Sequence, residues 1–200
     1  MFFSVNGYVL RSFPLEKKGK KVVFFSKEKG IIQFVAQGAL NPKSKNFSVC
    51  LPFRYFCLTL VQGRNSYRLI GGKTKEIYPG IFQSWKKLLA VKSIASDLEK
   101  IAPYGQDKNI FNLLRLTIKE IEKSDESFLR VLIPAFRLKL INLSGYGPDF
   151  NSLKGNKKIF TLFLEKSYKE LKQINFRKKE LLEAGFFIKD FFEITVQNLT

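Results

Sequence analysis

The stretch that decides the fold reads KVVFFSKEKGIIQFVAQ and runs from Lys21 to Gln37. β-Branched and aromatic residues, which favour strands, stand on both sides of the short polar segment Lys27-Glu28-Lys29-Gly30. Gly30 can adopt the positive φ that a tight hairpin turn requires. The pattern therefore predicts a hairpin with strands at Lys21–Ser26 and Ile31–Gln37.

Three further strands are expected around this hairpin, at Val5–Arg11, Cys50–Val61 and Ser66–Ile70, with a break or bulge at Gly71-Gly72. Five short strands in fewer than eighty residues, with no helical period, are typical of a small Greek-key barrel. We predict a five-stranded OB-fold barrel, and an SH3-like barrel is the alternative.

Apolar residues recur at helical spacing after Gly80, so the rest of the chain is predicted to be helical. The predicted fold class is therefore α+β, with the strands first and the helices after them. An OB-fold nucleic-acid-binding domain at residues 1–79 is followed by a helical C-terminal domain at residues 80–200. Pro134 is expected to kink or restart the third helix. The expected helices are Ile81–Ile101, a helix capped by Asp107 that buries Ile110 to Ile121, a helix from Ser124 or Asp125 to Ser144 ended by Gly145, Lys157–Ile174, and Arg177–Val196.

The chain is strongly basic, with a net charge of +18 over 200 residues. Residues 1–79 carry fourteen Lys/Arg against three Asp/Glu, a net +11, and residues 80–200 carry a net +7. Such a charge attracts polyanions, and the binding should depend on salt. Composition drift is the competing explanation, because Lys outnumbers Arg 27 to 8 and Phe is abundant.

The basic residues of the predicted barrel are the candidates for nucleic-acid binding. The lysines around Gly19 have an alternative role as a charged strand edge that prevents aggregation. Tyr55 or Tyr67 could stack on bases, although a ring of this kind is more often part of a core. The candidate residues are Arg11, Lys17, Lys18, Lys20, Lys21, Lys43, Lys45, Arg54, Arg64 and Arg68, with Tyr55 and Tyr67.

Catalytic and metal chemistry find little support in the sequence. The chain has no histidine, which excludes Ser-His-Asp and Cys-His nucleophiles. Cys50 and Cys57 are seven residues apart in a predicted strand, so they face opposite sides and share neither a disulfide nor a metal. We therefore expect no enzyme activity, no cofactor and no metal. The longest apolar run, Val131–Phe136, is too short to cross a membrane, so a cytoplasmic protein is expected.

Several short motifs occur in an order that resembles the RecO family of bacterial recombination and repair proteins. The opening strand Gly7–Arg11 and the hairpin Phe24–Gly30 are similar to the start of that family. Ala36–Ala39 and Leu51-Pro52-Phe53 resemble its "a-x-G-a" and "L-x-P-F" motifs, and Phe136–Phe150 resembles its "F-E-x-x-L-L…G-Y-x-P-x-L" segment.

This resemblance implies an OB fold, a helical C-terminal domain and a mediator role in homologous recombination. It further implies binding to single- and double-stranded DNA, annealing of complementary strands, and a nucleoid-associated location. The implied protein partners are a RecR-like protein, with which recombinase is loaded, and the acidic tail of the single-strand-binding protein.

The chain also departs from the family pattern. Many relatives carry a four-cysteine zinc module after the Gly-Tyr-x-Pro loop, but residues 151–158 here contain no cysteine. Pro134-Ala135 stands where the family often has basic residues that serve tail binding. Arg130, Arg137 and Lys139 could replace them, since an acidic peptide with an aromatic end needs a cation beside an apolar groove.

Two other functions remain open on the sequence alone. One is an RNA- or ribosome-associated OB-fold protein, which would use the same cations and rings. The other is a protein–protein adapter, in which the helical part docks a partner and the basic charge is incidental.

Overall fold

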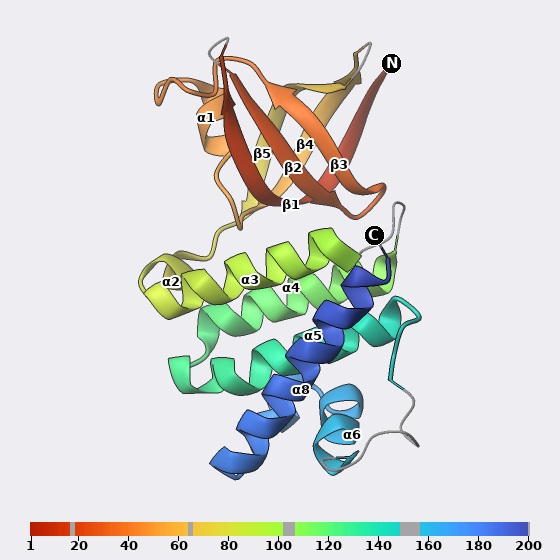
Figure 1. Cartoon of the computed structure of the whole chain (residues 1–200). Helices are drawn as coiled ribbons and strands as arrows, with labels where there is room; N and C mark the ends of the chain where they lie inside the picture. The colour runs from red at the N-terminus through yellow and green to blue at the C-terminus, as the bar shows by residue number, and fades with distance from the viewer. Residues whose placement is uncertain (17–18, 64–65, 102–106, 149–156, 200) are drawn as a thin grey trace. The chain divides into compact units, whose positions relative to one another are not determined.

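The computed structural model of the chain describes residues 1–16, 19–63, 66–101, 107–148 and 157–199 (Figure 1). Internal contacts divide the chain into two compact units. The first, the barrel unit, comprises Met1–Pro79 and a stretch that ends at Phe111, and the second, the helical unit, comprises the rest.

The barrel unit is a closed barrel with the strand order β1-β2-β3-β5-β4. All neighbouring strands are antiparallel except β3 and β5, which pair in parallel through Phe34–Tyr67 and Val35–Arg68. This order, with a short helix between β3 and β4, is that of an OB fold. The predicted five-stranded OB-fold barrel is therefore confirmed, and the SH3-like alternative does not fit. The strands are β1 (Phe2–Leu15), β2 (Gly19–Ser26), β3 (Gly30–Ala36), β4 (Tyr55–Gln62) and β5 (Tyr67–Glu76).

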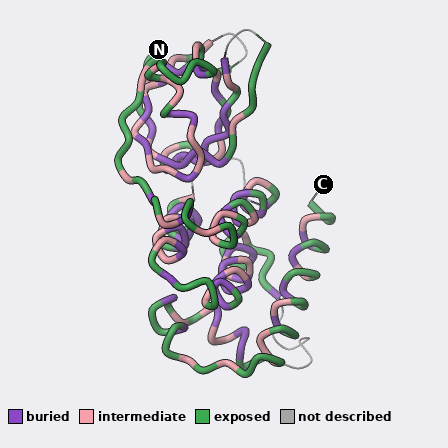
Figure 2. Tube along the Cα trace, turned by 90° about the vertical axis from the view of Figure 1, so that its left-hand side faces the viewer, coloured by how far each residue is buried: buried purple, intermediate pink, exposed green. Residues whose placement is uncertain are grey.

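Alternate side chains of the strands fill the barrel, as expected for a sheet closed on itself. On β4 Phe56, Leu58 and Leu60 lie on one face and are fully buried, and Tyr55 and Cys57 on the other face are only half-buried. Val9 and Phe24 complete this core from β1 and β2. Figure 2 shows the same alternation of buried and more exposed residues around the barrel wall.

The predicted strand Cys50–Val61 is wrong over its first five residues. Ser44 caps a short helix, α1 (Lys45–Val49), and the buried Cys50 ends it. Pro52 follows, and Phe53 has a φ of 59°, a left-handed conformation that interrupts an extended strand. Both cysteines are free thiols, but they are separated by this turn and not by strand alternation.

The last strand continues through Gly71-Gly72 to Glu76 and carries a bulge instead of a break. The pairing with β4 shifts between Thr59 and Leu60, so one residue of β5 has no opposite partner. A Cβ atom at Gly72 would collide with the Leu58 side chain, so glycine lets β5 pass close to the core.

The helical unit is organised around α5, which contacts α3, α6, α8 and η1. Asp107 caps α4 as predicted, because its Oδ1 accepts the backbone N–H groups of Asn109 and Ile110. Gly145 follows α5 with a positive φ, also as predicted. The elements are α2 (Pro79–Phe82), α3 (Trp85–Ile101), α4 (Lys108–Lys123), η1 (Glu126–Phe128), α5 (Leu129–Leu143), α6 (Lys157–Glu165), α7 (Tyr168–Leu171) and α8 (Lys178–Gln197).

Three details of the helical prediction need correction. Of the two outcomes expected at Pro134, the restart is wrong, because Pro134 lies inside the single helix α5 and a proline removes only one intrahelical hydrogen bond. The expected helix Lys157–Ile174 is two helices, since Ser167 and Glu170 form a capping box that starts α7. The expected helix Ile81–Ile101 is also two helices, because α2 ends at Phe82 and α3 begins at Trp85.

Among the described residues, no helix combines the length and the apolar character that crossing a membrane requires.

The barrel has no space for a side chain at Gly7, and a substitution there can test this. A Cβ atom there would collide with the Phe25 carbonyl oxygen of the neighbouring strand, whereas one at Gly71 would meet no atom within 4 Å. Gly7→Ala should lower the free energy of unfolding by about 1–3 kcal/mol, the usual range for overpacking, and Gly71→Ala should leave it nearly unchanged. Urea denaturation followed by circular dichroism measures both variants. Equal stability of the two would contradict this account of the barrel.

Candidate nucleic-acid interface

Two of the predicted cations lie in one row on the outside of the barrel. Lys21 on β2 pairs with Val35 on β3, and Val35 pairs with Arg68 on β5. Directly paired residues project from the same face of a sheet, and neighbouring strands are about 4.8 Å apart. The Lys21 and Arg68 backbones are thus about 10 Å apart, with both side chains exposed and the half-buried Val35 between them.

An open hollow of about 310 Å³ lies along this row, which we call the barrel groove. Tyr67 lines it and is half-buried, with its ring packed edge-on against Phe3 at a centroid distance of 5.0 Å. The described residues of the lining include no Asp or Glu, so the electrostatic environment favours an anion. The lining is Lys21, Gln33, Phe34, Val35, Gln62, Ser66 and Tyr67.

Lys20 belongs to a different environment from its neighbour Lys21, because adjacent strand residues point to opposite faces. Its Nζ lies 4.9 Å from the centre of the Phe47 ring in α1, a cation–π contact. Burial raises the pKa of the nearby Cys50 thiol to about 11, although the positive charge of Lys20 opposes the shift. The thiol is therefore protonated and unreactive at neutral pH.

Phe13 extends the row on β1, and Arg11 lies two residues before it. Its guanidinium stacks 4.7 Å from the centre of the Phe13 ring, and Phe13 pairs with Lys21 across β1 and β2. Lys43 and Lys45 are exposed, in the turn before α1 and at the start of α1.

Tyr55 and Arg54 lie at the other end of the β4–β5 hairpin from Tyr67. Tyr55 pairs with Glu76, whereas Tyr67 pairs with Gln62, and the seven residue steps from Tyr55 to Gln62 span about 23 Å. The Tyr55 ring packs 5.1 Å from Tyr8 and 6.3 Å from Phe111 within the barrel unit. The lining of the barrel groove therefore contains Lys21 and Tyr67, with Arg68 in the outer row beside it, and does not include Tyr55 or Arg54. Lys17, Lys18 and Arg64 lie outside the described residues.

The helical unit has an apolar groove of about 520 Å³ between α5 and α8, the α5–α8 groove. Arg130 and Arg137, both predicted to bind a partner peptide, lie in its lining with Lys178 and Lys189. The described lining contains four cations and no carboxylate. Its other residues are Ser127, Leu129, Ile133, Pro134, Phe176, Leu181, Leu182, Gly185 and Phe186.

Arg137 is held in place by α3. Its Nε donates to Asp97 Oδ2 at 2.8 Å, and its Nη2 donates to Ser93 Oγ at 2.9 Å. Among the described residues Nη1 has no hydrogen-bond partner. Burial raises the pKa of the Asp97 carboxyl, and the adjacent Arg137 opposes this shift. A buried pair of this kind fixes the direction of the guanidinium.

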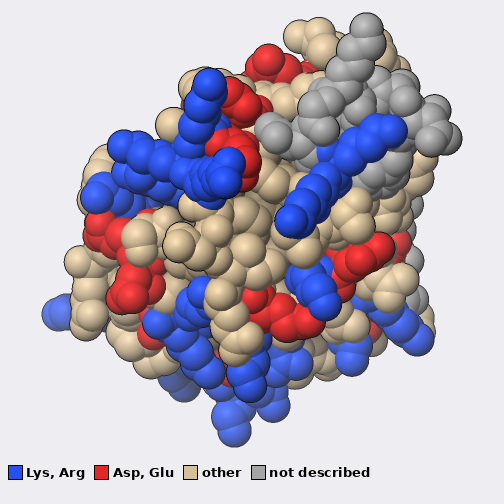
Figure 3. All heavy atoms as spheres, turned by 90° about the horizontal axis from the view of Figure 1, so that it is seen from below, with Lys and Arg blue, Asp and Glu red and all other residues tan. Residues whose placement is uncertain are grey.

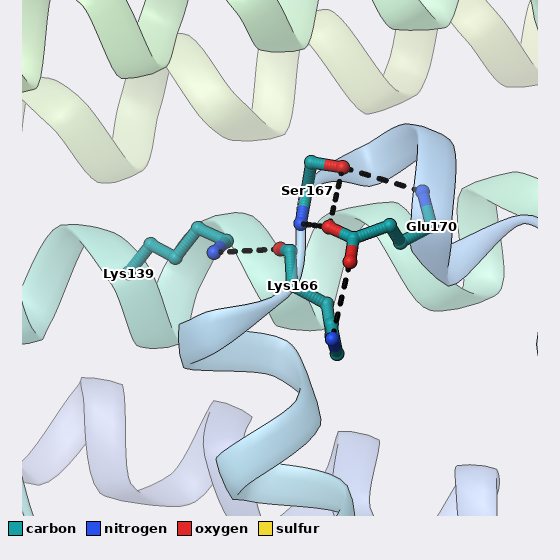
Figure 4. A network of polar contacts seen from close by, with 4 residues as sticks. All are labelled: Lys139, Lys166, Ser167 and Glu170. Atoms are coloured by element: carbon teal, nitrogen blue, oxygen red, sulfur yellow. Dashed lines mark hydrogen bonds and ion pairs between the residues drawn. The ribbon is translucent and has the colours of Figure 1, made fainter.

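Lys139 has a structural role in the fold and is not part of the described groove lining. Its Nζ donates to the carbonyl oxygen of Leu164 at 2.7 Å, at the end of α6, and to that of Lys166 at 3.1 Å, and Figure 4 shows the second contact. Burial lowers its pKa. In the same network, Glu170 accepts the backbone N–H and the hydroxyl of Ser167, and Lys166 donates to its other oxygen.

Cations elsewhere on the helical unit are interspersed with acids. Figure 3 shows lysine and arginine side chains in several separate groups with acidic side chains between them. Lys86–Glu126 and Lys172–Glu120 are ion pairs of 2.8 and 2.7 Å. The described part of the chain also contains no cluster of three or more His, Cys, Asp or Glu residues that could hold a metal ion.

Sequence reasoning missed the neutral members of both sites. Gln33 and Gln62 line the barrel groove, but their place follows from strand register, which local sequence does not encode. Asp97 carried no signal beyond being an acid within an apolar helix. Phe186 and Leu182 could have been found, because they lie four apart and next to the cationic start of α8.

Comparisons with known proteins identify a matching family model and several relatives of the chain. Residues 1–78 match the family model described as "Recombination protein O N terminal". The chain is similar to the protein named "DNA repair protein RecO" from Alkaliphilus metalliredigens (strain QYMF), with 31% identity over 153 residues, 76% of this chain and 62% of the relative. The protein of the same name from Clostridium perfringens (strain 13 / Type A) is 29% identical over 149 residues, 74% of this chain and 60% of the relative. The chain thus spans about 60% of the length of these curated relatives.

The capping box of Ser167 and Glu170 leads to a prediction about how the stability of the fold depends on pH. Hydrogen bonds from Ser167 hold the pKa of Glu170 at about 2, below its ordinary value. A carboxylate with a lowered pKa in the folded state stabilises that state above its unfolded pKa of about 4.3, and the effect is lost as the pH falls to about 2. Ser167→Ala removes the hydroxyl donor but keeps the backbone N–H, so it should raise the pKa of Glu170 only part of the way toward about 4.3, and Ser167→Thr, which can still cap, should not raise it. Carboxyl-carbon NMR titration measures the three proteins, and an unchanged pKa in Ser167→Ala would contradict the assignment.

Proposed function

The chain belongs to the RecO family, and on this premise we propose that it acts in DNA repair and recombination as a protein that binds DNA without chemical catalysis. It binds single- and double-stranded DNA through the barrel unit and anneals complementary strands. It helps load recombinase onto protein-coated single strands, together with a RecR-like protein.

The observation that carries this proposal is the row of Lys21 and Arg68 on the two sides of Val35, with Tyr67 in the adjoining hollow. Backbone phosphates pair with the two cations, and the half-exposed tyrosine ring offers a surface on which a base can stack. Neither contact reads a base edge, which suits the binding of arbitrary sequences.

Annealing follows from the same electrostatics. Phosphates that pair with lysine and arginine release condensed counterions, and this release favours binding at low salt. A basic protein that holds one strand also reduces the repulsion between that strand and its complement.

The perturbed titratable groups support a role without catalysis. The pKa of Tyr78 is raised by burial and by hydrogen bonds to Tyr8 and Glu76. That of Tyr168 is raised by burial, and its hydroxyl lies 2.8 Å from Thr117 Oγ1 inside the helical unit. These groups have structural partners, and neither lines the barrel groove or the α5–α8 groove.

The α5–α8 groove is the proposed site for an acidic peptide with an aromatic end, such as the tail of a single-strand-binding protein. Its apolar lining accepts the aromatic side chain, and its four cations accept carboxylates. Arg137 Nη1, which has no partner among the described residues, is the donor best placed for a carboxylate.

Removing the two cations of the row should weaken DNA binding in a characteristic way. The variant Lys21→Gln with Arg68→Gln loses two phosphate contacts, so the slope of log K against log salt for single strands should become shallower by about 1.4. Fluorescence anisotropy with a labelled oligonucleotide over a salt series measures this slope.

Lys73→Gln with Lys75→Gln is the matched control, because it removes the same charge from exposed positions farther along β5. This control should keep the slope and the rate at which complementary strands anneal. If both double variants bind and anneal equally, the binding depends on total charge and not on the barrel groove. Competition with structured RNA that displaces single-stranded DNA would favour an RNA-binding protein instead.

The peptide site can be tested at Gly185, which lines the α5–α8 groove on α8. Gly185→Leu should fill the groove and abolish peptide binding, and it should keep or raise stability, because leucine is a better helix former than glycine by up to about 1 kcal/mol. Gly185→Ala should still bind, since the added Cβ lies 3.6 Å from Pro134, an ordinary contact. Calorimetric titration with an acidic peptide ending in phenylalanine distinguishes the variants. Unchanged binding by Gly185→Leu would place the peptide elsewhere.

A further inference from the structure

A second groove lies on the other side of the first turns of α5, and we call it the α3–α5 groove. It has a volume of about 720 Å³, and its described lining comes from α3, η1 and α5. Four of its residues also line the α5–α8 groove, so the two hollows meet over α5. The lining is Lys86, Leu89, Ala90, Ser93, Glu126, Ser127, Leu129, Arg130 and Ile133, of which Ser127, Leu129, Arg130 and Ile133 are shared.

The two grooves are also joined through a hydrogen bond. Ser93 lines the α3–α5 groove, and its Oγ accepts from Nη2 of Arg137, which lines the α5–α8 groove. Arg130, exposed on α5, belongs to both linings. A chain that crosses α5 at this point would therefore keep contact with a cation throughout.

The chemistry of the α3–α5 groove is apolar with a basic margin. Leu89 is 46% exposed, and the neighbouring Trp85 is 68% exposed. The acid Glu126 is already neutralised, because Lys86 Nζ lies 2.8 Å from its Oε2 and Ser84 Oγ donates to its Oε1 at 2.6 Å. Hydrogen bonds from Lys86 and Ser84 lower the pKa of Glu126, so it remains charged and paired. The remaining cation, Arg130, favours an acidic segment next to an apolar side chain.

We propose that the α3–α5 groove binds the upstream part of the same acidic peptide whose aromatic end occupies the α5–α8 groove. This inference rests on the proposed peptide site. A helix is about 10 Å wide, and an extended chain advances about 3.3 Å per residue, so three or four residues cross α5. The second groove therefore takes an apolar side chain about four positions before the aromatic end, and the acidic residues between them lie over Arg130.

Two peptides test this with the full chain by isothermal titration calorimetry. One reads Gly-Gly-Leu-Asp-Asp-Asp-Phe, and the other replaces the leucine with serine. The leucine peptide should bind about tenfold more tightly, because its side chain becomes buried in the α3–α5 groove. Leu89→Gln, at an exposed position of that groove, should remove this advantage and leave the affinity for the serine peptide unchanged. Leu116→Gln, at an exposed leucine of α4 outside both groove linings, should preserve both affinities.

Each other outcome has a distinct meaning. If neither peptide binds, the proposed peptide site itself fails. If the serine peptide binds and the leucine peptide gains nothing, or keeps its gain in Leu89→Gln, the two-groove inference is overturned and the first site stands. Loss of self-association in Leu89→Gln, measured by sedimentation and without any peptide effect, would instead assign the α3–α5 groove to contacts between copies of the chain and overturn the inference.

Discussion

The parallel pairing of β3 with β5 is the contact on which the barrel depends. The β1–β2–β3 meander and the β4–β5 hairpin each have two free edges, and β1 pairs with β4 along one side. The short pairing of Phe34 with Tyr67 and of Val35 with Arg68 closes the other. Closure removes exposed strand edges, which otherwise invite aggregation. It also places Lys21 and Arg68, 47 positions apart in the numbering, on one outer row.

In the helical unit, a buried ion pair between Asp97 on α3 and Arg137 on α5 links two helices. Asp97 and Arg137 are 7% and 16% exposed, so their charges are largely removed from water. Removing one partner of such a pair usually costs about 3–5 kcal/mol, because the other charge stays buried alone. The pair and Ser93 fix two of the three guanidinium nitrogens, and the third is oriented before any ligand binds. Such preorganisation lowers the entropic cost of binding.

Local sequence predicted those features that local physics determines. The hairpin from Lys21 to Gln37 and the Asp107 cap depend on alternation, turn chemistry and capping within a few residues. The α1 helix was missed because five residues of Lys-Asn-Phe-Ser-Val carry no helical period. The capping box that divides α6 from α7 has a sequence signature, Ser-x-x-Glu, which the periodicity of the apolar residues obscured.

The candidate sites could not be assembled from local patterns, because they depend on pairing between distant segments. Lys20 and Lys21 are neighbours in sequence but face opposite sides of β2. Tyr55 and Tyr67 belong to one hairpin but lie at its opposite ends. Arg137, predicted to bind a partner peptide, has two of its nitrogens bound by α3.

Mapping the contact between the chain and a single strand tests the central claim most directly. A photoreactive oligonucleotide is cross-linked to the full chain, and the modified residues are identified by mass spectrometry. The account predicts adducts on β2, β3 and the start of β5, around Lys21, Gln33 and Tyr67. Adducts confined to the Tyr55 end of the hairpin, or to exposed Trp85 of the helical unit, would contradict it.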